Sequence, residues 1–218
     1  MRVFIGVDPR SPVAYNVLQW SIVRRSTKPV QVIPLVLPQL PIQRRGLTDF
    51  TFTRYLPPFL CNYKGVSLFL DADMIVTGDI HELAGHIDGE HAVYVAQHQQ
   101  RFEWPSMMLF DNDKCEKLTP EYINDETTKP QSLSWAGSIG NLPPEWNFCV
   151  GYDEYTEATP KLIHFTQGVP FFAECRYADY AGYWWAEYNS MVSSCSWLEL
   201  MGQSVHAEPV LKRLGVVK

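Results

Sequence analysis

Cysteines are few in this sequence and are not spaced as pairs. The five cysteines are widely separated, and no two of them form the C-x-x-C pair of zinc ribbons and redox motifs. An odd, scattered set argues against both a disulfide framework and a structural zinc site. We therefore expect reduced, buried thiols in a cytoplasmic protein.

Long hydrophobic runs are also missing. No stretch approaches the roughly 20 apolar residues of a membrane-spanning helix. The apolar run Val3–Val7 at the start of the chain is far too short for the core of a signal peptide. These absences predict a soluble protein without a membrane span, and they leave open only a peripheral contact with a membrane.

Runs of like charge are missing as well. The 18 Lys and Arg against 24 Asp and Glu give a net charge of −6, without the basic cluster that binds nucleic acid. Nucleic acid is therefore not an expected partner. Because 46% of the 218 residues are hydrophobic and 19% are charged, as in ordinary globular proteins, we expect one compact domain over residues 1–218.

The start of the chain alternates between strand and helix patterns. Val3–Val7 is a short apolar run, Ser11–Arg25 has apolar residues at helical spacing, and Val30–Leu37 is β-branched and bounded by prolines. A strand, a helix and a second strand in this order form a β-α-β unit, which joins parallel strands. The sequence therefore predicts an α/β fold with an open, mostly parallel sheet.

The later elements are shorter and less regular. Residues 112–146 are rich in Thr, Pro, Ser and Asn, so we expect substrate-shaping loops there rather than sheet. The other expected elements are a helix bent by two prolines over Phe50–Tyr63, a buried strand over Val66–Leu70, a short helix capped by Asp79, strands over Ala92–Ala96, Met107–Phe110 and Leu162–Phe165, and an aromatic helical segment over Glu174–Met201.

Two aspartates, Asp71 and Asp73, follow the buried strand Val66–Leu70. Residues two apart in extended chain project to the same side, so both carboxylates can face one point beyond the strand end, where open α/β sheets bind ligands. A D-x-D pair alone is a weak signal, since it often only caps a strand. With this apolar strand before it, the pair predicts a Mg²⁺ or Mn²⁺ site that can take a diphosphate.

A histidine stands at the end of another apolar strand. His164 follows Leu162 and Ile163 and precedes the loop that contains Gly168. A glycine in such a loop lets the backbone approach a phosphate closely. An imidazole as third ligand beside two aspartates favours Mn²⁺ over Mg²⁺, because nitrogen donors suit the softer metal.

Several motifs occur in an order that resembles a known enzyme family. After the β-α-β start come Thr53-Arg54-Tyr55, the strand and turn ending in Asp71-Ala72-Asp73, Leu142-Pro143-Pro144-Glu145-Trp146-Asn147 and His164-Phe165-Thr166-Gln167-Gly168. Over roughly residues 3–172 this order resembles retaining nucleotide-sugar glycosyltransferases of the GT-A fold, close to family 8, which includes bacterial lipopolysaccharide galactosyltransferases and glycogenin. The resemblance implies a single Rossmann-like GT-A domain whose mixed, mostly parallel sheet is flanked by helices.

The resemblance also implies a metal site and a reaction. Asp71, Asp73 and His164 match the family's ligands for Mn²⁺, or Mg²⁺, with the donor diphosphate bound to the ion. Asp73 and Arg54 are then the catalytic candidates. The implied reaction transfers a hexose with retention from a nucleoside-diphosphate sugar to a carbohydrate, glycolipid or protein acceptor.

Donor contacts follow from the same resemblance. Asp8 matches in position an aspartate that contacts the nucleobase, and its carboxylate suits the imide of a pyrimidine, which favours a UDP-sugar. Arg54 is expected near the diphosphate or the donor sugar. Ala72, Asn147 and Gly168 stand in the matching motifs and are also expected at the donor.

The chain departs from the family pattern around the transferred sugar. The loop after His164 continues as Gly168-Val169-Pro170-Phe171, without the family's lysine. Trp104-Pro105-Ser106 stands where Asn-x-Gly is common, and Ser132–Trp135 stands where the family has Asp-Gln-Asp. The sugar and the residue that faces the anomeric carbon therefore stay open.

Two other functions fit some of these residues. Haloacid-dehalogenase-like phosphatases also place D-x-D after an apolar strand, with the first aspartate as nucleophile. They need that strand near the N-terminus and a later lysine and acidic pair, whereas Asp71 comes after seventy residues and Ile75 stands where they have Thr or Val. The missing lysine and Asp-Gln-Asp element also allow a nucleotide-sugar-binding module that has lost turnover.

Overall fold

The computed structural model describes residues 1–193, 204–213 and 215. Its strands are β1 (Arg2–Gly6), β2 (Gln31–Leu35), β3 (Val66–Leu70), β4 (Met74–Val76), β5 (Val93–Ala96), β6 (Met107–Asp111), β7 (Ile139–Leu142), β8 (Phe148–Cys149) and β9 (Leu162–His164). Its α-helices are α1 (Pro12–Arg25), α2 (Pro57–Leu60), α3 (Pro120–Asn124), α4 (Ala181–Ser193) and α6 (Ala207–Arg213). Short 3₁₀ helices include η2 (Thr53–Tyr55), η3 (Ile80–His86), η4 (Arg101–Ser106), η8 (Pro144–Trp146) and η9 (Ala173–Cys175).

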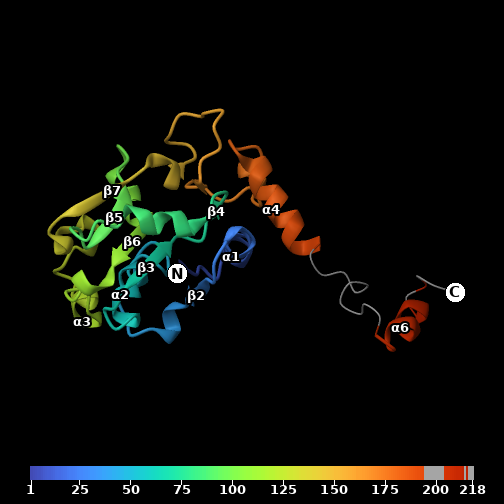
Figure 1. Ribbon diagram of the computed structural model, residues 1–218, viewed down its shortest axis with the longest axis horizontal. Helices are drawn as coiled ribbons and strands as arrows, with labels where there is room; N and C mark the ends of the chain where they lie inside the picture. Colours follow the sequence, from blue (N-terminus) through green and yellow to red (C-terminus); the bar gives the residue numbers. More distant parts are fainter. Residues whose placement is uncertain (194–203, 214, 216–218) are drawn as a thin grey trace.

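A six-stranded sheet forms the centre of the molecule, in the order β2-β1-β3-β6-β5-β7 (Figure 1). β1 pairs in parallel with β2 and β3, and β5 pairs in parallel with β7. β6 is antiparallel to both of its neighbours. The prediction of an α/β fold with a mixed, mostly parallel sheet is confirmed.

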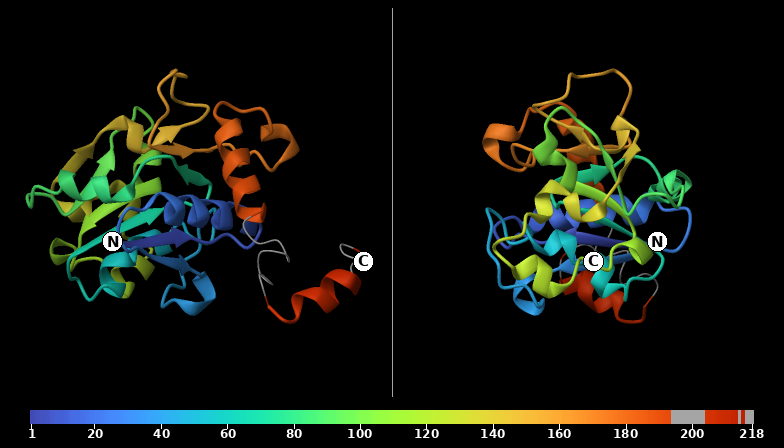
Figure 2. Two further views of the ribbon diagram at one scale, coloured as in Figure 1. Left: turned by 45° about the vertical axis from the view of Figure 1, so that its right-hand side comes forward. Right: turned by 90° about the vertical axis from the view of Figure 1, so that its left-hand side faces the viewer.

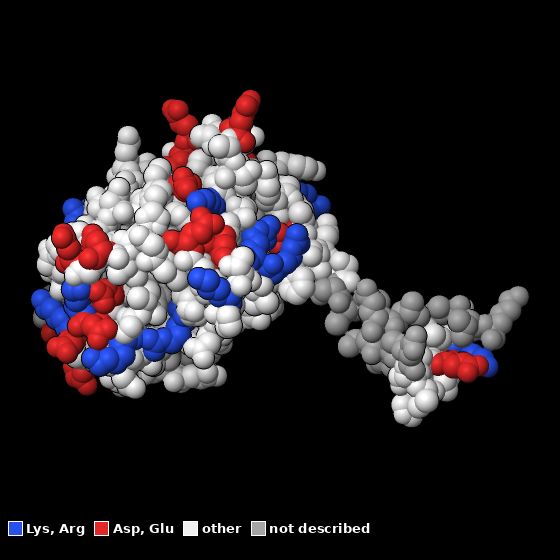
Figure 3. Space-filling view, viewed as in Figure 1, with Lys and Arg blue, Asp and Glu red and all other residues white. Residues whose placement is uncertain are grey.

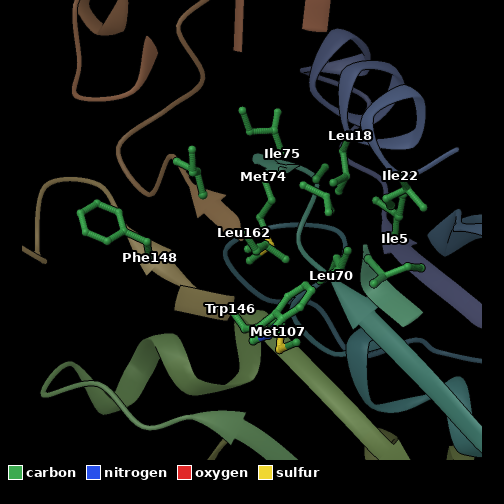
Figure 4. Packing of buried hydrophobic residues seen from close by; sticks show 14 of the residues in the cluster. Ile5, Leu18, Ile22, Leu70, Met74, Ile75, Met107, Trp146, Phe148 and Leu162 are labelled. Atoms are coloured by element: carbon green, nitrogen blue, oxygen red, sulfur yellow. The ribbon is translucent and has the colours of Figure 1, made fainter. Parts of the chain in front are cut away.

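Helices cover both faces of this sheet, because successive residues of a strand point to opposite faces. In β1, Ile5 belongs to one buried cluster and Phe4 to the other, and Leu70 and Phe69 of β3 divide in the same way. Residues of α1 and α4 complete the first cluster, part of which Figure 4 shows, whereas α3 and the segment around α2 complete the second. Figure 2 shows these layers from two further sides.

Helix α1 illustrates how the sequence sets an element and its packing. Pro12 occupies the first turn, where its missing N–H costs nothing. Arg25 in the last turn places its Nη2 atom 2.6 Å from Oε1 of Glu187, which links α1 to α4. The apolar residues at helical spacing face the sheet and are buried: Ala14, Val17, Leu18 and Ile22.

A second, three-stranded sheet, β4-β9-β8, adjoins the first and was not predicted. β4 pairs antiparallel with β9, so that Met74 lies opposite His164, and β8 pairs in parallel with β9. These strands contain only two or three residues each. Such short runs carry almost no periodic signal, and their pairing decides where His164 lies.

Loops were predicted rather than sheet over 112–146, which is wrong for its last residues. Ile139–Leu142 forms β7 at the edge of the central sheet, with Ile139 opposite Val93. Gly140 lies against the ring of Tyr94, whose Cδ1 would be 2.1 Å from any Cβ at this position. Glycine weakens the sequence signal for a strand, but here it makes room for an aromatic ring.

Two helical predictions also differ in extent. The bent helix expected over Phe50–Tyr63 is η2 followed by the single turn α2, because Pro57 and Pro58 cannot donate the hydrogen bonds that would continue a helix. Within the aromatic segment expected over Glu174–Met201, the structure has η9 and then α4. Residues 194–201, including Trp197, lie outside the described residues.

The surface charges and the cysteines are arranged as the composition of the chain predicts. Acidic and basic side chains are interspersed on the face that Figure 3 shows. The cysteines at 61, 115, 149 and 175 are free, the first three buried and Cys175 partly exposed. Among the described helices, none combines the length and the hydropathy needed to cross a membrane.

Candidate metal and donor site

The carboxyl ends of β1 and β3 meet at one edge of the central sheet. These strands are parallel neighbours, so Asp8, shortly after β1, and Asp71, directly after β3, emerge at the same edge. The backbone N–H of Asp71 donates to the carbonyl of Ser106, just before β6, at 2.9 Å. This edge is where open α/β sheets bind ligands.

Pairing of β4 with β9 brings Asp73 to His164. Asp73 directly precedes β4, and its carbonyl accepts a hydrogen bond of 2.9 Å from the N–H of Phe165, directly after β9. Nε2 of His164 lies 3.3 Å from Oδ1 of Asp73. Two residues far apart in the sequence thus become direct neighbours.

Asp71, Asp73 and His164 form one compact cluster. One ligand atom from each lies within 4.8 Å of the others. The side chain of Asp71 is 9% exposed and that of His164 3%, whereas Asp73 is 32% exposed. The cluster is therefore built from two buried side chains and one that opens to solvent.

Arg54 lies behind the cluster, against Asp71. Its Nη2 atom is 3.1 Å from both carboxylate oxygens of Asp71 and donates a hydrogen bond to Oδ2. Among the described groups, none donates a hydrogen bond to Oδ1 of Asp71 or to Oδ1 of Asp73, although both atoms are buried. Each of these oxygens lies in an ion pair, with Arg54 and His164 respectively, but accepts no hydrogen bond. Buried polar atoms are normally satisfied, so both oxygens can still accept a ligand.

Burial and charge shift the pKa values of two of these groups. Burial raises the pKa of Asp71 to about 7, against the opposing effect of Arg54 and with a further contribution from Asp73. Burial alone would lower the pKa of His164, but the negative charge of Asp73 outweighs burial, so the pKa is raised well above its usual value. A divalent cation between these groups would replace the protons that they hold.

The predicted donor residues line a neighbouring pocket of about 450 Å³. Asp8, Ala72, Asp73 and Gly168 all contribute to its wall. Thr166, Gln167 and Val169, which belong to the loop after His164, also line the wall. The remaining wall residues were not expected at the donor from the sequence: Arg10, Ser11, Ala14, Thr48, Phe50 and Phe172. One cavity therefore joins the end of β1, the D-x-D turn and the loop after β9.

Asp8 forms an ion pair with the neighbouring Arg10. Nη2 of Arg10 lies 2.5 Å and Nε 3.1 Å from Oδ2 of Asp8. The hydrogen bond from Arg10 holds the pKa of Asp8 below its usual value, against the effect of burial. The Arg10 side chain is 70% exposed and can turn outward, whereas the Asp8 side chain is 13% exposed, so its carboxylate would then need another hydrogen-bond donor.

Arg54 and Asn147 are placed differently from the other expected donor residues. Neither lines the pocket. Asn147 is fully buried and donates through Nδ2 to Oγ of Ser106 at 3.0 Å. Arg54 forms an ion pair with Asp71, which does not line the pocket either, so Arg54 and Asn147 both act on the site from within the protein.

Two neighbours of His164 were not found from the sequence. Its Nδ1 atom lies 3.8 Å from Oε2 of Glu103 and 3.9 Å from Sγ of Cys149. Glu103 belongs to η4 and Cys149 ends β8, and neither stands at a ligand spacing from the D-x-D turn. Only the departure from the family pattern at Trp104-Pro105-Ser106 marks this stretch in the sequence.

The donor set fits a hard or borderline divalent cation. It offers carboxylate oxygens from Asp71 and Asp73 and an imidazole nitrogen from His164. Both unsatisfied oxygens belong to this set. Mn²⁺ and Mg²⁺ accept such ligands and keep positions for phosphate oxygens and water.

A curated relative, rather than a family model, shows the family to which the chain belongs. No protein-family model matches it. The curated protein CDI from Arabidopsis thaliana is 32% identical over 227 aligned residues, which cover 86% of this chain and 87% of that protein.

Solved structures of glycosyltransferases share the fold at low sequence identity. The bifunctional glycosyltransferase WbbM superposes with a TM-score of 0.66 at 15% identity over 90% of this chain. GlyE from Streptococcus pneumoniae gives 0.65 at 18% identity over 88%. The chain spans 50% of the WbbM chain and 62% of the GlyE chain.

The galactosyltransferase LgtC, solved with donor and acceptor sugar analogs, gives a TM-score of 0.60 at 11% identity, over 91% of this chain and 99% of LgtC. All three structures therefore support the same fold. This chain belongs to the family of the Arabidopsis thaliana protein CDI and has the GT-A fold of these glycosyltransferases.

Proposed function

We propose that this protein is a metal-dependent glycosyltransferase that moves a hexose from a UDP-sugar to a carbohydrate, glycolipid or protein acceptor, with retention. The observation that carries the proposal is the cluster of Asp71, Asp73 and His164, of which Asp73 lines the same pocket as Asp8. The fold shared with glycosyltransferases, one of them solved with donor and acceptor sugar analogs, supports it.

In this proposal Asp71, Asp73 and His164 hold Mn²⁺ or Mg²⁺. The cation neutralises charge on the departing diphosphate, which is typically worth several kcal/mol. Arg54 opposes the effect of burial on the pKa of Asp71 and so favours the ionised form that a cation needs. Asp73, the most exposed of the three ligands, faces the pocket and orients the diphosphate through the ion.

The pocket wall would hold the rest of the donor. Asp8 would accept a hydrogen bond from the uracil imide once Arg10 has turned outward, where its guanidinium can pair with a phosphate instead. Gly168 has a φ of +123°, a conformation that L side chains rarely adopt, and a Cβ there would lie 3.2 Å from Cys175 and Phe172. Glycine thus keeps the loop beside the diphosphate compact.

A thermal-shift experiment tests the proposal. The protein is heated with Mn²⁺, with UDP-sugars, and with both together, and we expect the midpoint to rise most with both because such ligands bind the native state. Release of UDP with Mn²⁺ and an acceptor mixture would establish turnover. No midpoint shift with any UDP-, GDP- or ADP-sugar in the presence of Mn²⁺ would overturn the proposal.

The same experiment separates the alternatives. A midpoint shift without release of nucleoside diphosphate would indicate a binding module that has lost turnover. Release of inorganic phosphate from simple phosphate esters would indicate a phosphatase. The phosphatase is disfavoured, because its nucleophile would be Asp71, whose carboxylate is buried against Arg54 rather than exposed in the pocket.

A further inference from the structure

His164 presents its two ring nitrogens to different partners. Nε2 faces Asp73 at 3.3 Å, on the side of the proposed metal site. Nδ1 faces Oε2 of Glu103 at 3.8 Å and Sγ of Cys149 at 3.9 Å. A histidine that binds a metal through one nitrogen almost always donates its other N–H to a carboxylate, a carbonyl or water.

We propose that Glu103 is the positioning residue of this site: its carboxylate accepts the Nδ1–H of His164 and thereby holds the Nε2 lone pair toward the cation. The inference rests on the proposed function, because it concerns the same metal site. Glu103 would not touch the cation or the substrate. Its effect passes through the orientation and the tautomer of His164.

Of the two neighbours of Nδ1, Glu103 is the stronger acceptor. A carboxylate forms charge-assisted hydrogen bonds, whereas a thiol is a weak acceptor. The Sγ–H of Cys149 donates to the carbonyl of Asn147 at 3.4 Å. Cys149 therefore fills the space beside the imidazole, and Glu103 supplies the charge.

The position of Glu103 is fixed by hydrogen bonds to its own backbone. Oγ of Ser106 donates to the carbonyl of Glu103 at 2.6 Å, and Nδ2 of Asn147 donates to the same carbonyl at 3.4 Å. Nδ2 of Asn147 also donates to Oγ of Ser106, whose carbonyl accepts the N–H of Asp71. The helix η4 is thus tied to the strand end that carries a metal ligand.

The charges around the cluster also support a cation there. Three carboxylates, those of Asp71, Asp73 and Glu103, converge on the cluster, and Arg54 brings a single guanidinium against them. The Glu103 side chain is only 14% exposed, so water screens it weakly. A divalent cation would balance the negative charge that remains.

The test measures Mn²⁺ affinity, by electron paramagnetic resonance of the free ion, for wild-type protein and for Glu103→Gln, Glu103→Asp and Glu103→Ala. We expect affinity to fall about 10- to 100-fold in Glu103→Gln and Glu103→Ala, as is typical when a supporting carboxylate is lost. Glu103→Asp keeps the charge and should recover part of it. Glu116→Gln, the same change at an exposed residue, should bind like the wild type.

A second measurement reports on His164 directly. Long-range ¹H–¹⁵N spectra of the Mg²⁺-bound protein should show the proton of His164 on Nδ1, with a mixed tautomer in Glu103→Gln. The unfolding midpoint in EDTA should stay near that of the wild type in Glu103→Gln, since this substitution conserves shape. If the unfolding midpoint in EDTA of Glu103→Gln falls clearly below that of the wild type, Glu103 has a structural role and the inference is overturned.

The outcomes separate the two proposals. If wild-type protein binds Mn²⁺ and Glu103→Gln binds it equally well, the positioning role is wrong and the metal site stands. If Cys149→Ala weakens binding while Glu103→Gln does not, the acceptor is Cys149 and the inference falls. If the wild type binds neither Mn²⁺ nor Mg²⁺, the proposed function itself fails.

Discussion

The two ends of β3 place acidic side chains in opposite situations. At the amino end, Oδ1 of Asp113 pairs with Nζ of Lys64 at 3.0 Å, and Oδ2 accepts the N–H of Gly65 at 2.8 Å. Asn112 beside it is fully buried and accepts from Oγ of Ser67 at 2.7 Å. All of these groups have protein partners.

At the carboxyl end, the carboxylates of Asp71 and Asp73 are only partly satisfied. Each keeps a buried oxygen without a hydrogen bond from the described residues, and the two carboxylates face each other across the cluster with His164. Leaving such groups unsatisfied costs stability. The difference teaches that the amino end serves the fold, whereas the carboxyl end is arranged for a ligand.

The largest effect is expected from Asp73→Asn, which tests whether the carboxyl end of β3 binds a cation. The amide keeps the shape but removes one anionic ligand, so Mn²⁺-dependent donor binding and turnover should fall at least about 100-fold, in line with the several kcal/mol that a metal contributes. Titration calorimetry with Mn²⁺ and UDP, and UDP release, measure the effect. Retained Mn²⁺ affinity in a folded variant would remove Asp73 from the ligand set.

A change of pH should affect only the carboxyl end. The pKa of Asp71 is raised to about 7 and that of His164 is raised as well, so protons compete with the cation at low pH. As pH rises, the protonated fractions fall and Mn²⁺ affinity increases, by about tenfold per unit for each of the two groups while it is still mostly protonated. Affinities measured at pH 6 and pH 8 in the same salt should differ accordingly, and equal values would contradict the buried, protonated state of Asp71.

At the amino end, Asn112→Ala should lower stability without touching the site. The substitution leaves the buried Ser67 Oγ without its acceptor, which costs about 1–3 kcal/mol, and removes one of the donors to the carbonyl of Lys64. Urea unfolding in EDTA measures this loss. Mn²⁺ affinity should stay at the wild-type value, and a clear fall in affinity would show that the two ends are coupled.

The smallest effect is expected for Asp113→Asn, the matched control for Asp73→Asn. Asp113 is exposed, and exposed ion pairs contribute little. The unfolding midpoint should therefore change little, and donor binding not at all. A loss of donor binding comparable to that of Asp73→Asn would show that overall charge, rather than the cluster, governs the site.

The sequence predicted the elements whose signal is local. The apolar pattern of Val66–Leu70 and the helical spacing of 11–25 specify β3 and α1, because burial selects hydrophobic residues at fixed periods. β4, β7, β8 and β9 are two to four residues long, and β7 contains Gly140 under the ring of Tyr94. Of these, β9 has a local signal, the apolar run that predicts a strand over Leu162–Phe165. No local pattern encodes the other three strands or the pairing of β4 with β9.

The sequence alone set the place of the D-x-D turn, because the apolar run Val66–Leu70 puts both aspartates at the carboxyl end of β3. The spacing of two predicts one direction for both side chains in extended chain, but the chain turns at Ala72 and Asp73. The tertiary structure decided what that turn meets: His164 opposite Met74 in the β4–β9 register, Arg54 against Asp71, and Glu103 beside the imidazole. Burial, unsatisfied oxygens and shifted pKa values arise only from these long-range contacts, because they depend on which atoms exclude water from the carboxylates.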